Sequence, residues 1–468
     1  DYTYDIKGNI TSMIDYKFDG NNSIPYHYTY YEYDLNGTMT GYAEINASSD
    51  PDEGVISNHK LVYNYDVEGN LSEIVYPTSL NDGITSIKFE YNEYNWITKI
   101  KAKINSVDKE LRDYSYNTDG TINNIKDYTY DTNGNVNGYI LKKYTYDNFG
   151  RVSSMKYYNS DSDTVKESYT YTYDENSNIK SEYIINNYPT NGSNKVNQSR
   201  EYTYDVMNRL TNSLIEDTDK NNPYSVYYTY DNVGNRLSMR DENTKTVTSY
   251  TYNDLNQLIS STESKLSNSE DIVSNKNYSY DGNGNNVKEV DSIKNITKEM
   301  IYDVDNRLDT YTEIKNNETT VQSNLYNGNG QRIQKQEGNN TINYYYQGSN
   351  VLYTTNGEGD KTSHNFVGLE GNTISTMRYD LTGLEYYVYN KDVKGSTSNL
   401  VDNNKNAKIS YKYSDFGETE EFGDTDFYNE IAYTGGIYDE STALYYLNAR
   451  YYNPEDARFI TQDTYRGS

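Results

Sequence analysis

The chain has 468 residues, a formal net charge of −28, no Cys and only three His. This charge argues against a nucleic-acid partner, because phosphate binding needs a basic surface. The lack of Cys excludes disulfides and Cys-ligated metal, and the scattered His27, His59 and His364 speak against a His-based metal or triad site, so no cofactor is expected.

A repeat of nine residues runs through most of the chain, from YTYDIKGNI at 2–10 to LYNGNGQRI at 325–333. It reads Tyr-x-Tyr, then Asp or Asn, two variable residues, Gly, Asn or Ser, one variable residue, and an aliphatic residue or Met. Positions in each copy are counted from this Asp or Asn. Position −1 is Tyr in all copies, and position −3 is aromatic in twelve. The fourteen copies are aligned on Asp5, Asp34, Asp66, Asn92, Asn117, Asp131, Asp147, Asp174, Asp205, Asp231, Asn253, Asp281, Asp303 and Asn327.

Each copy predicts a strand, a tight turn and a second strand. Positions −3 and −1 lie on the same face of a strand, so the Tyr pair shares one face. Asp or Asn at the start of a turn can cap backbone amides, and Gly or Asn at +3 accepts positive φ. The clearest turn pairs are Asp5 with Gly8, Asp66 with Gly69, Asp131 with Gly134, Asp147 with Gly150, and Asp231 with Gly234.

Two details of the repeat carry further expectations. The aliphatic residue stands at +5 in eleven copies and at +6 in three (Leu237, Val287 and Ile333), which we interpret as a β-bulge that absorbs one extra residue. The repeat Asp residues are interpreted as turn caps rather than calcium ligands, because a calcium loop needs several converging oxygens. The segment DGNGNN at Asp281 comes nearest to such a loop and lacks its distal Glu.

Composition supports an all-β chain with a core built of Tyr. There are 59 Tyr and one Trp, and the mean hydropathy of −1.01 would otherwise indicate disorder. Tyr buries a large ring while its hydroxyl keeps a partner. No apolar run approaches the ~18 residues of a membrane span, and residue 1 falls inside a repeat, so the chain is expected to be part of something longer.

The pattern divides the chain at about residue 335. Residues 1–335 are interpreted as the repeat array, and 336–468 as a specialised continuation with further hairpins of other turn chemistry. The last quarter contains DVKGSTSNLVDNNKNAKISYKYSDFGE at 392–418 and GIYDESTALYYLNARYYNPEDARFITQDTYRG at 436–467.

These segments resemble the Rhs/YD-repeat family, which includes the C components of Tc toxins and the teneurins. The repeats look like its YD hairpins, and the last segment is similar to its core-associated signature, in a form typical of Gram-positive members. The matching residues are Tyr438, Asp439, Leu444, Tyr445, Tyr446, Ala449, Arg450, Tyr451, Tyr452, Pro454, Arg458, Phe459 and Asp463. The resemblance implies hairpins wound into a spiral sheet that forms a hollow shell, complete or partial, with the core-associated segment as a plug.

Some members of the family cut themselves at the core end with paired Asp residues, and here Asp456 and Asp463 are the candidates. The chain departs from the cleaving pattern at Asn453, Thr464 and Arg466, so we interpret both carboxylates as structural and expect no enzymatic activity. Arg450 and Arg458 lie among aromatic residues and are expected to anchor the plug by ring stacking or carboxylate contacts, with passenger recognition as the alternative.

Two functions remain open. The first is a secreted or cell-surface bacterial shell that sequesters a C-terminal effector of the same polypeptide. The second is an adhesion module whose Tyr rows bind cell-surface glycans. Sugar-binding arrays usually rely on Trp, and this chain has only Trp96, so the shell is favoured.

Overall fold

The computed structural model describes residues 1–463 with gaps at 19, 132, 161, 189–195, 219, 221, 370, 381–382 and 425. Within these ranges the chain is almost wholly β, and the exceptions are α1 (Glu53–Asn58) and two short 3-10 turns, η1 (Thr78–Leu80) and η2 (Tyr433–Gly435). Thirty-four of the described strands belong to one antiparallel sheet, and β35 to β38 form a second, small sheet. The predicted all-β class, with tandem hairpins in one sheet, is confirmed.

The chain forms two compact units. Unit 1 comprises Asp1–Lys142, Tyr326–Ile333 and Ile342–Val388, and unit 2 comprises Lys143–Leu325, Gln334–Thr341 and Tyr389–Ser468. Each unit therefore combines early hairpins with later strands. The boundary predicted at residue 335 remains a division of the sequence pattern.

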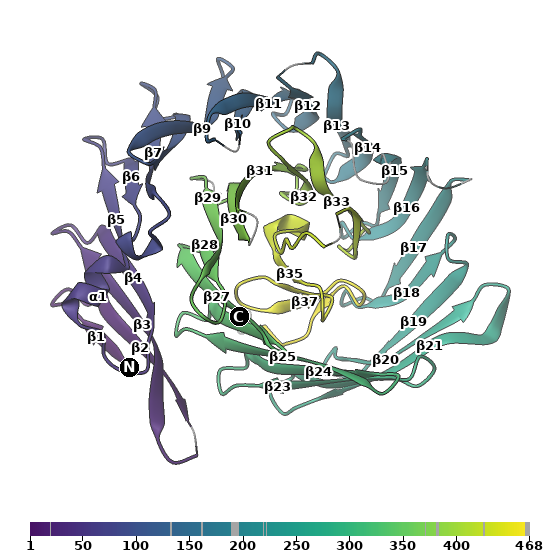
Figure 1. Cartoon of the computed structure of the whole chain (residues 1–468). Helices are drawn as coiled ribbons and strands as arrows, with labels where there is room; N and C mark the ends of the chain where they lie inside the picture. The colour runs from purple at the N-terminus through teal and green to yellow at the C-terminus, as the bar shows by residue number, and fades with distance from the viewer. Residues whose placement is uncertain are drawn as a thin grey trace. The chain divides into compact units, whose positions relative to one another are not determined.

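Unit 1 has a hairpin layer in which each strand pairs with the next along the chain, from β1 with β2 to β9 with β10 (Figure 1). Later strands pack on this layer; the amide of Tyr346, for example, donates to Glu44 at 2.8 Å. The strands of the hairpin layer are β1 (Tyr2–Tyr4), β2 (Ile10–Phe18), β3 (Ser23–Tyr33), β4 (Met39–Asn46), β5 (Lys60–Tyr65), β6 (Leu71–Val75), β7 (Ile84–Tyr91), β8 (Ile97–Ile104), β9 (Val107–Tyr116), β10 (Ile122–Tyr130) and part of β11 (Val136–Tyr146). The later strands are β27 (Asn340–Gln347), β28 (Asn350–Thr355), β29 (Lys361–Val367), β30 (Thr373–Asp380) and part of β31 (Gly383–Lys391).

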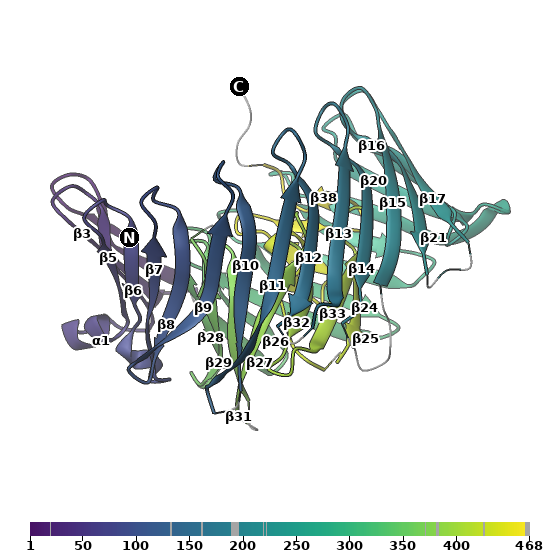
Figure 2. The ribbon, with the colours of Figure 1, turned by 90° about the horizontal axis from the view of Figure 1, so that it is seen from above.

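Unit 2 repeats this organisation, and its antiparallel hairpin strands follow one another side by side in chain order (Figure 2). Those strands are β12 (Val152–Asn159), β13 (Val165–Tyr173), β14 (Ile179–Asn186), β15 (Val196–Tyr204), β16 (Leu210–Asp217), β17 (Tyr224–Tyr230), β18 (Arg236–Asp241), β19 (Thr246–Tyr252), β20 (Leu258–Lys265), β21 (Asn268–Tyr280), β22 (Asn286–Asp291), β23 (Ile296–Tyr302), β24 (Leu308–Lys315), β25 (Glu318–Tyr326) and β26 (Arg332–Glu337). The later strands are β32 (Thr397–Val401), β33 (Ala407–Tyr413), β34 (Thr419–Gly423), β35 (Ile437–Asp439), β36 (Leu444–Tyr446), β37 (Tyr451–Asn453) and β38 (Arg458–Phe459).

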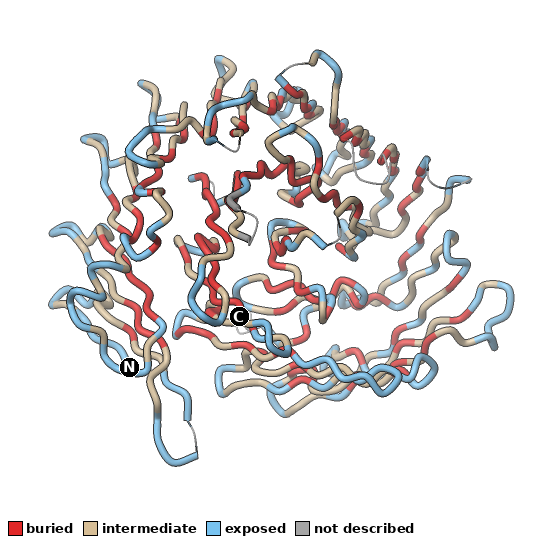
Figure 3. Tube along the Cα trace, viewed as in Figure 1, coloured by how far each residue is buried: buried red, intermediate tan, exposed pale blue. Residues whose placement is uncertain are grey.

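All fourteen repeat turns close with the same pair of backbone hydrogen bonds. In the first copy, the Asp5 amide donates to the Asn9 carbonyl at 2.9 Å and the Gly8 amide to the Asp5 carbonyl at 3.1 Å. The Asp5 carboxylate accepts from the amides of Lys7 and Asn9, and Gly8 has a φ of +87°. The same contacts and positive φ recur in the turns of Asp66 and Gly69, Asp131 and Gly134, Asp147 and Gly150, and Asp231 and Gly234. Figure 3 shows these turns exposed and much of the strands buried.

The register corrects one expectation about the repeat. Position −1 pairs with position +5 both where +5 is aliphatic, as in Tyr4 with Ile10, and where it is polar, as in Tyr230 with Arg236. A register shift accompanies the turn in both kinds of copy. The extra residue predicted for three copies is therefore wrong: their turns have the ordinary length, and a polar residue takes the +5 place. Arg236 and Arg332 are both buried there.

A hydrogen bond between successive hairpins gives the Tyr at position −1 a structural role in nine of the fourteen copies. The Tyr91 hydroxyl donates to the carbonyl of Leu71, which is position +5 of the preceding copy, at 2.7 Å. The Tyr413 hydroxyl makes the same contact with Thr397 beyond the repeat array. We call this contact the tyrosine latch. Nine repeat residues make it: Tyr65, Tyr91, Tyr116, Tyr173, Tyr204, Tyr230, Tyr252, Tyr280 and Tyr302.

We expect Tyr252→Phe to lower the free energy of unfolding by about 1 kcal/mol, because the carbonyl of Arg236 loses its hydroxyl donor while the ring keeps its packing. Tyr4→Phe is the matched control, because Tyr4 occupies the same repeat position and is exposed. Urea unfolding of both variants checks this. Equal midpoints for the two variants would show that the latch contributes nothing.

The turns beyond residue 336 also correct the sequence analysis. The backbone pair that closes the repeat turns closes those that begin at Asn356, Gly368, Asp392, Asp402 and Ser414. The expectation of other turn chemistry is therefore wrong for these five turns, whereas the hairpin of β27 and β28, in which Gln347 pairs with Asn350 around Gly348, has the different turn that was expected. Gly or Ser in the leading position hides the pattern, because the backbone can make this turn without the Asp side chain.

Candidate functional site: the core segment and its anchors in unit 2

The segment Tyr389–Asp463, here called the core segment, packs on the hairpin strands of unit 2. Its contacts run along the hairpin layer from Glu167 on β13, which accepts from Asn399, to Lys335 on β26, which donates to Glu430. Because these strands follow one another in the sheet, the layer curves around the core segment (Figure 1). The strands β35 to β38, here called the signature sheet, form the last described part of the segment.

Most residues of the predicted signature lie in the signature sheet. Tyr438 and Asp439 are on β35, and Asp439 pairs with Leu444 of β36. The rings of Tyr438 and Tyr445 pack at a tilt with centroids 4.9 Å apart, and those of Tyr446 and Tyr451 do so with centroids 5.3 Å apart. The buried members are Asp439, Leu444, Tyr445, Tyr446, Tyr451 and Pro454, whereas Tyr452 is half-buried and Ala449 and Phe459 are exposed.

The two signature arginines have different surroundings. Arg458 donates to Asn235 at 3.2 Å and to the Asn256 carbonyl at 2.6 Å, so it ties the signature sheet to two hairpin turns. Arg450 lies 3.7 Å from the Phe459 ring centroid and 3.0 Å from the Asp463 carboxylate. Arg458 thus has the contacts of an anchor, while Arg450 pairs within its own segment.

The candidate carboxylates Asp456 and Asp463 lie in separate environments. Asp456 is buried and accepts from the Tyr278 hydroxyl at 3.0 Å and from the side-chain amide of Asn453 at 2.9 Å. Asp463 is exposed beside Arg450. The predicted departures Thr464 and Arg466 lie outside the described residues. The described contacts therefore give each carboxylate partners of its own.

Burial raises the pKa of Asp456 to about 6. Between pH ~4 and ~6 the folded state keeps a proton on Asp456 that the unfolded state has already lost. The stability of the protein therefore falls across this range: the favourable contribution of the protonated Asp456 is complete below pH ~4 and is lost as the pH rises through ~6. We expect Asp456→Asn to stabilise the protein relative to the wild type by about 1–3 kcal/mol at pH 7 and by much less at pH 4. Urea unfolding at both pH values checks this, and a difference that does not depend on pH would contradict it.

Buried ionic contacts fix the core segment to the hairpins. Arg200 of β15 donates to Asp415 at 3.2 Å and to the Tyr413 carbonyl at 2.7 Å. The buried Lys276 of β21 lies 2.5 Å from the carboxylate of Glu455, whose side chain is 47% exposed. Truncating one partner of a buried pair leaves an uncompensated charge, so such contacts hold the two layers in one register.

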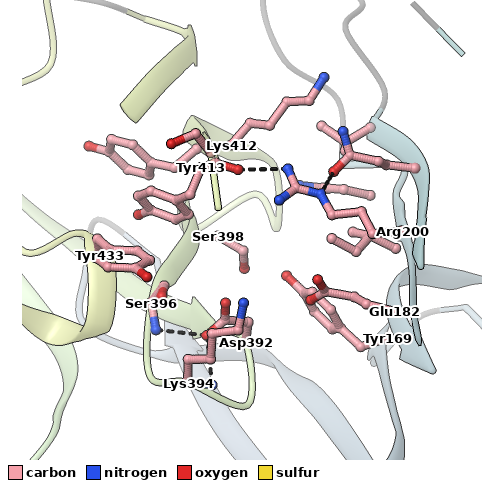
Figure 4. A pocket seen from close by; sticks show the side chains of 16 residues that line it. Tyr169, Glu182, Arg200, Asp392, Lys394, Ser396, Ser398, Lys412, Tyr413 and Tyr433 are labelled. Atoms are coloured by element: carbon pink, nitrogen blue, oxygen red, sulfur yellow. Dashed lines mark hydrogen bonds between the residues drawn. The ribbon is translucent and has the colours of Figure 1, made fainter. Parts of the chain in front are cut away.

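A polar pocket lies between the two layers, where Tyr169, Glu182 and Arg200 of β13 to β15 face the core segment (Figure 4). The core segment contributes Asp392, Lys394, Ser396, Ser398, Lys412, Tyr413 and Tyr433. Burial raises the pKa of Asp392 to about 6. Arg200 donates hydrogen bonds to Gln198, to Asp415 and to the Tyr413 carbonyl, and Lys412 donates one to Asp217. The pocket is thus a polar part of the interface between the layers.

These anchors were not predicted, although the repeat contains a signal for them. Position −5 lies on the same strand face as the Tyr pair, because side chains alternate. That position holds Arg200, Lys276 and Gln322 in unit 2, and Arg112 and Lys142 in unit 1, all of which are buried. A charged residue on a Tyr-lined face indicates a buried partner in another layer.

Neither a metal-binding cluster nor a membrane-spanning helix is found among the described residues. No group of three or more His, Cys, Asp or Glu residues there is placed to hold a metal ion. None of the described helices has the length and apolar character needed to cross a membrane.

Comparison with known proteins adds evidence from sequence. No family model matches the chain. The tRNA3(Ser)-specific nuclease WapA of Bacillus spizizenii is 30% identical over 264 residues, which cover 55% of this chain and 10% of that protein. The tRNA nuclease WapA of Bacillus subtilis (strain 168) is 29% identical with the same coverage. The chain thus spans about a tenth of the length of these relatives.

Solved structures of Tc toxins also align with the chain. The TcdB2-TccC3-TEV crystal structure has a TM-score of 0.29 at 15% identity and covers 99% of this chain and 30% of that one. The Photorhabdus luminescens Tc holotoxin pore has a TM-score of 0.30 at 15% identity and covers 99% of this chain and 29% of that one. The YD repeats, their common hairpin turn, the core signature and the similarity to the WapA proteins together support the assignment of this chain to the Rhs/YD-repeat family.

Proposed function

We propose that this chain is the structural sheet of a larger bacterial Rhs/YD-repeat protein, secreted or displayed at the cell surface, and that it sequesters a C-terminal effector of the same polypeptide. The observation that carries this proposal is the anchoring of the core segment to one face of the hairpin layer from β13 to β26. A layer that only had to display Tyr rings would not need charged anchors buried on that face.

The relatives suggest what kind of effector is involved. Both Bacillus proteins named above are described as tRNA nucleases, and the matched region is about a tenth of each. A nuclease is therefore the first candidate for the effector. The chain itself would act by steric enclosure, without turning over an external substrate.

Glycan binding is the weaker alternative. Sugar recognition needs exposed rings and free hydroxyl groups, whereas the latch tyrosines are occupied by backbone carbonyls of the neighbouring hairpin. The ring of Tyr228 at position −3 is likewise buried against Phe416. These contacts favour packing as the role of the repeat Tyr residues.

Electron microscopy of the purified chain tests the proposal. A hollow particle, or a curved sheet with a large interior, is expected if the chain encloses an effector. A thin rod without an interior would overturn enclosure. Glycan arrays would then become the next experiment, with the exposed Tyr2 and Tyr94 as the first residues to replace.

A further inference from the structure

A lysine and two carboxylates meet in the interior of unit 2, where β26 meets the signature sheet. The Lys335 ammonium lies 2.7 Å from Oε1 of Glu430 and 3.3 Å from Oδ1 of Asp439. The exposed fractions of the three side chains are 2%, 10% and 0%. Lys335 comes from the hairpin layer, whereas the two carboxylates come from the core segment.

We propose that Lys335 and Asp439 join through an intramolecular amide bond, with Glu430 as the catalytic residue. Amide formation needs a desolvated amine next to a carboxyl group, a base that can move protons between them, and a donor for the developing oxyanion. The three buried side chains supply the first two requirements at hydrogen-bond distances.

Gln322 of β25 supplies the third requirement. Its Nε2 donates to Oδ2 of Asp439 at 2.9 Å, while Lys335 contacts the other oxygen, Oδ1. Gln322 is fully buried, and its carbonyl oxygen accepts from Ser441 at 3.2 Å. The carboxamide is therefore held in place and polarises the carboxyl group for attack at Cγ.

Tyr428 completes the surroundings of the base. Its hydroxyl donates to Oε1 of Glu430, and the Lys335 ammonium donates to the same hydroxyl at 3.1 Å. The base and the nucleophile therefore share one hydrogen-bonding neighbour.

The reaction balances without any oxidant, reductant or co-reactant. Glu430 takes a proton from the Lys335 ammonium and passes it to the Asp439 carboxylate, which leaves a neutral amine beside a neutral acid. The Nζ lone pair attacks Cγ, and a C–N bond forms while Gln322 stabilises the tetrahedral oxygen. Glu430 then removes a second proton from Nζ and delivers it to the departing hydroxyl group. One C–O bond breaks, one water molecule leaves, and Glu430 ends as the carboxylate it was.

Burial favours this product. Keeping an ammonium and a carboxylate out of water costs several kcal/mol per ion, and the amide replaces both charges with one neutral group. Folding also holds the reacting groups together, and intramolecular reactions of well-oriented groups reach effective concentrations of about 10⁵–10⁸ M. The product would fix the signature sheet covalently to the hairpin layer.

A second buried Lys–Asp pair provides an internal control. In unit 1, the Lys142 ammonium lies 2.7 Å from the Asp127 carboxylate, with exposed fractions of 4% and 2%. The third member of this group is Arg112, whose Nη2 donates to Asp127 at 3.0 Å. Arg cannot take a proton from an ammonium, so this pair should remain an ion pair.

The test is mass spectrometry of the unmodified 468-residue protein under denaturing conditions. We expect the intact mass to fall below the sequence mass by one water molecule. Trypsin should fail to cut at Lys335 and should release 333–361 joined to 413–450, while it cuts at Lys142 as usual. Full sequence mass together with cleavage at Lys335 would overturn the proposal.

Glu430→Gln tests the catalytic role in a folded protein. The amide cannot shuttle the proton, so we expect the full sequence mass and free cleavage at Lys335, with a circular dichroism spectrum like that of the wild type. If a folded Glu430→Gln protein still lacks one water, Glu430 is not the base. Lys142→Arg is the matched control and should leave the mass deficit at Lys335 unchanged.

Discussion

Tyr130→Ala should lower the free energy of unfolding by about 3–5 kcal/mol, the range expected for removing a large buried ring. Tyr130 occupies position −1 of its repeat and is 6% exposed. Its ring meets the Tyr386 ring edge-on at 5.4 Å, and its hydroxyl donates to the Glu110 carbonyl. The substitution removes a contact between the hairpin layer and the later strands of unit 1, and it leaves a cavity between them.

Tyr4→Ala is the matched control, because Tyr4 has the same repeat position and is 60% exposed. We expect a cost below about 1 kcal/mol for it, as for other surface substitutions. Urea unfolding followed by near-ultraviolet circular dichroism measures both variants. A cost below ~1 kcal/mol for Tyr130 as well would place the repeat rings on the surface and revive the glycan hypothesis.

The comparison of these two residues shows what the repeat can and cannot specify. The hairpin follows from local chemistry, because Asp5 caps its own turn and Gly8 supplies the positive φ. Whether a given Tyr is buried depends on a strand more than 200 residues away, as with Tyr130 and Tyr386. No local pattern contains that information.

The core segment shows the same limit. The signature residues could be identified from the sequence, and Arg458 contacts Asn235 and Asn256 in two hairpin turns. The residues that contact the segment could not be identified. The repeat predicts hairpins around Arg200 and Lys335, but it does not say which later residues lie near them in space. The +5 position was misread for a simpler reason. An aliphatic residue was expected there, and a buried Arg236 looked like an insertion.

Arg200→Ala should lower the free energy of unfolding by about 3–5 kcal/mol, the usual cost of removing one partner of a buried ion pair. Arg200 and Asp415 have side-chain exposures of 8% and 2%. After the substitution, Asp415 keeps only the hydroxyl donors Ser213 and Tyr228 within the part of the chain that the structure describes. Two hydroxyl groups do not neutralise a buried carboxylate, so the core segment should loosen from β15.

The size of this effect separates an anchor from an ordinary surface ion pair. Arg240→Ala breaks a 2.7 Å contact with Glu242 in which both side chains are much more exposed, at 52% and 32%, and we expect less than about 1 kcal/mol. The double variant Arg200→Ala/Asp415→Ala should cost less than the sum of the two single variants, because the orphaned charge is removed with its partner. Limited proteolysis should then find new cuts in the core segment of Arg200→Ala and none in Arg240→Ala. If Arg200→Ala and Arg240→Ala lose equal stability and resist protease alike, the buried pair does not hold the core segment. The enclosure proposed for this chain then loses its main structural support.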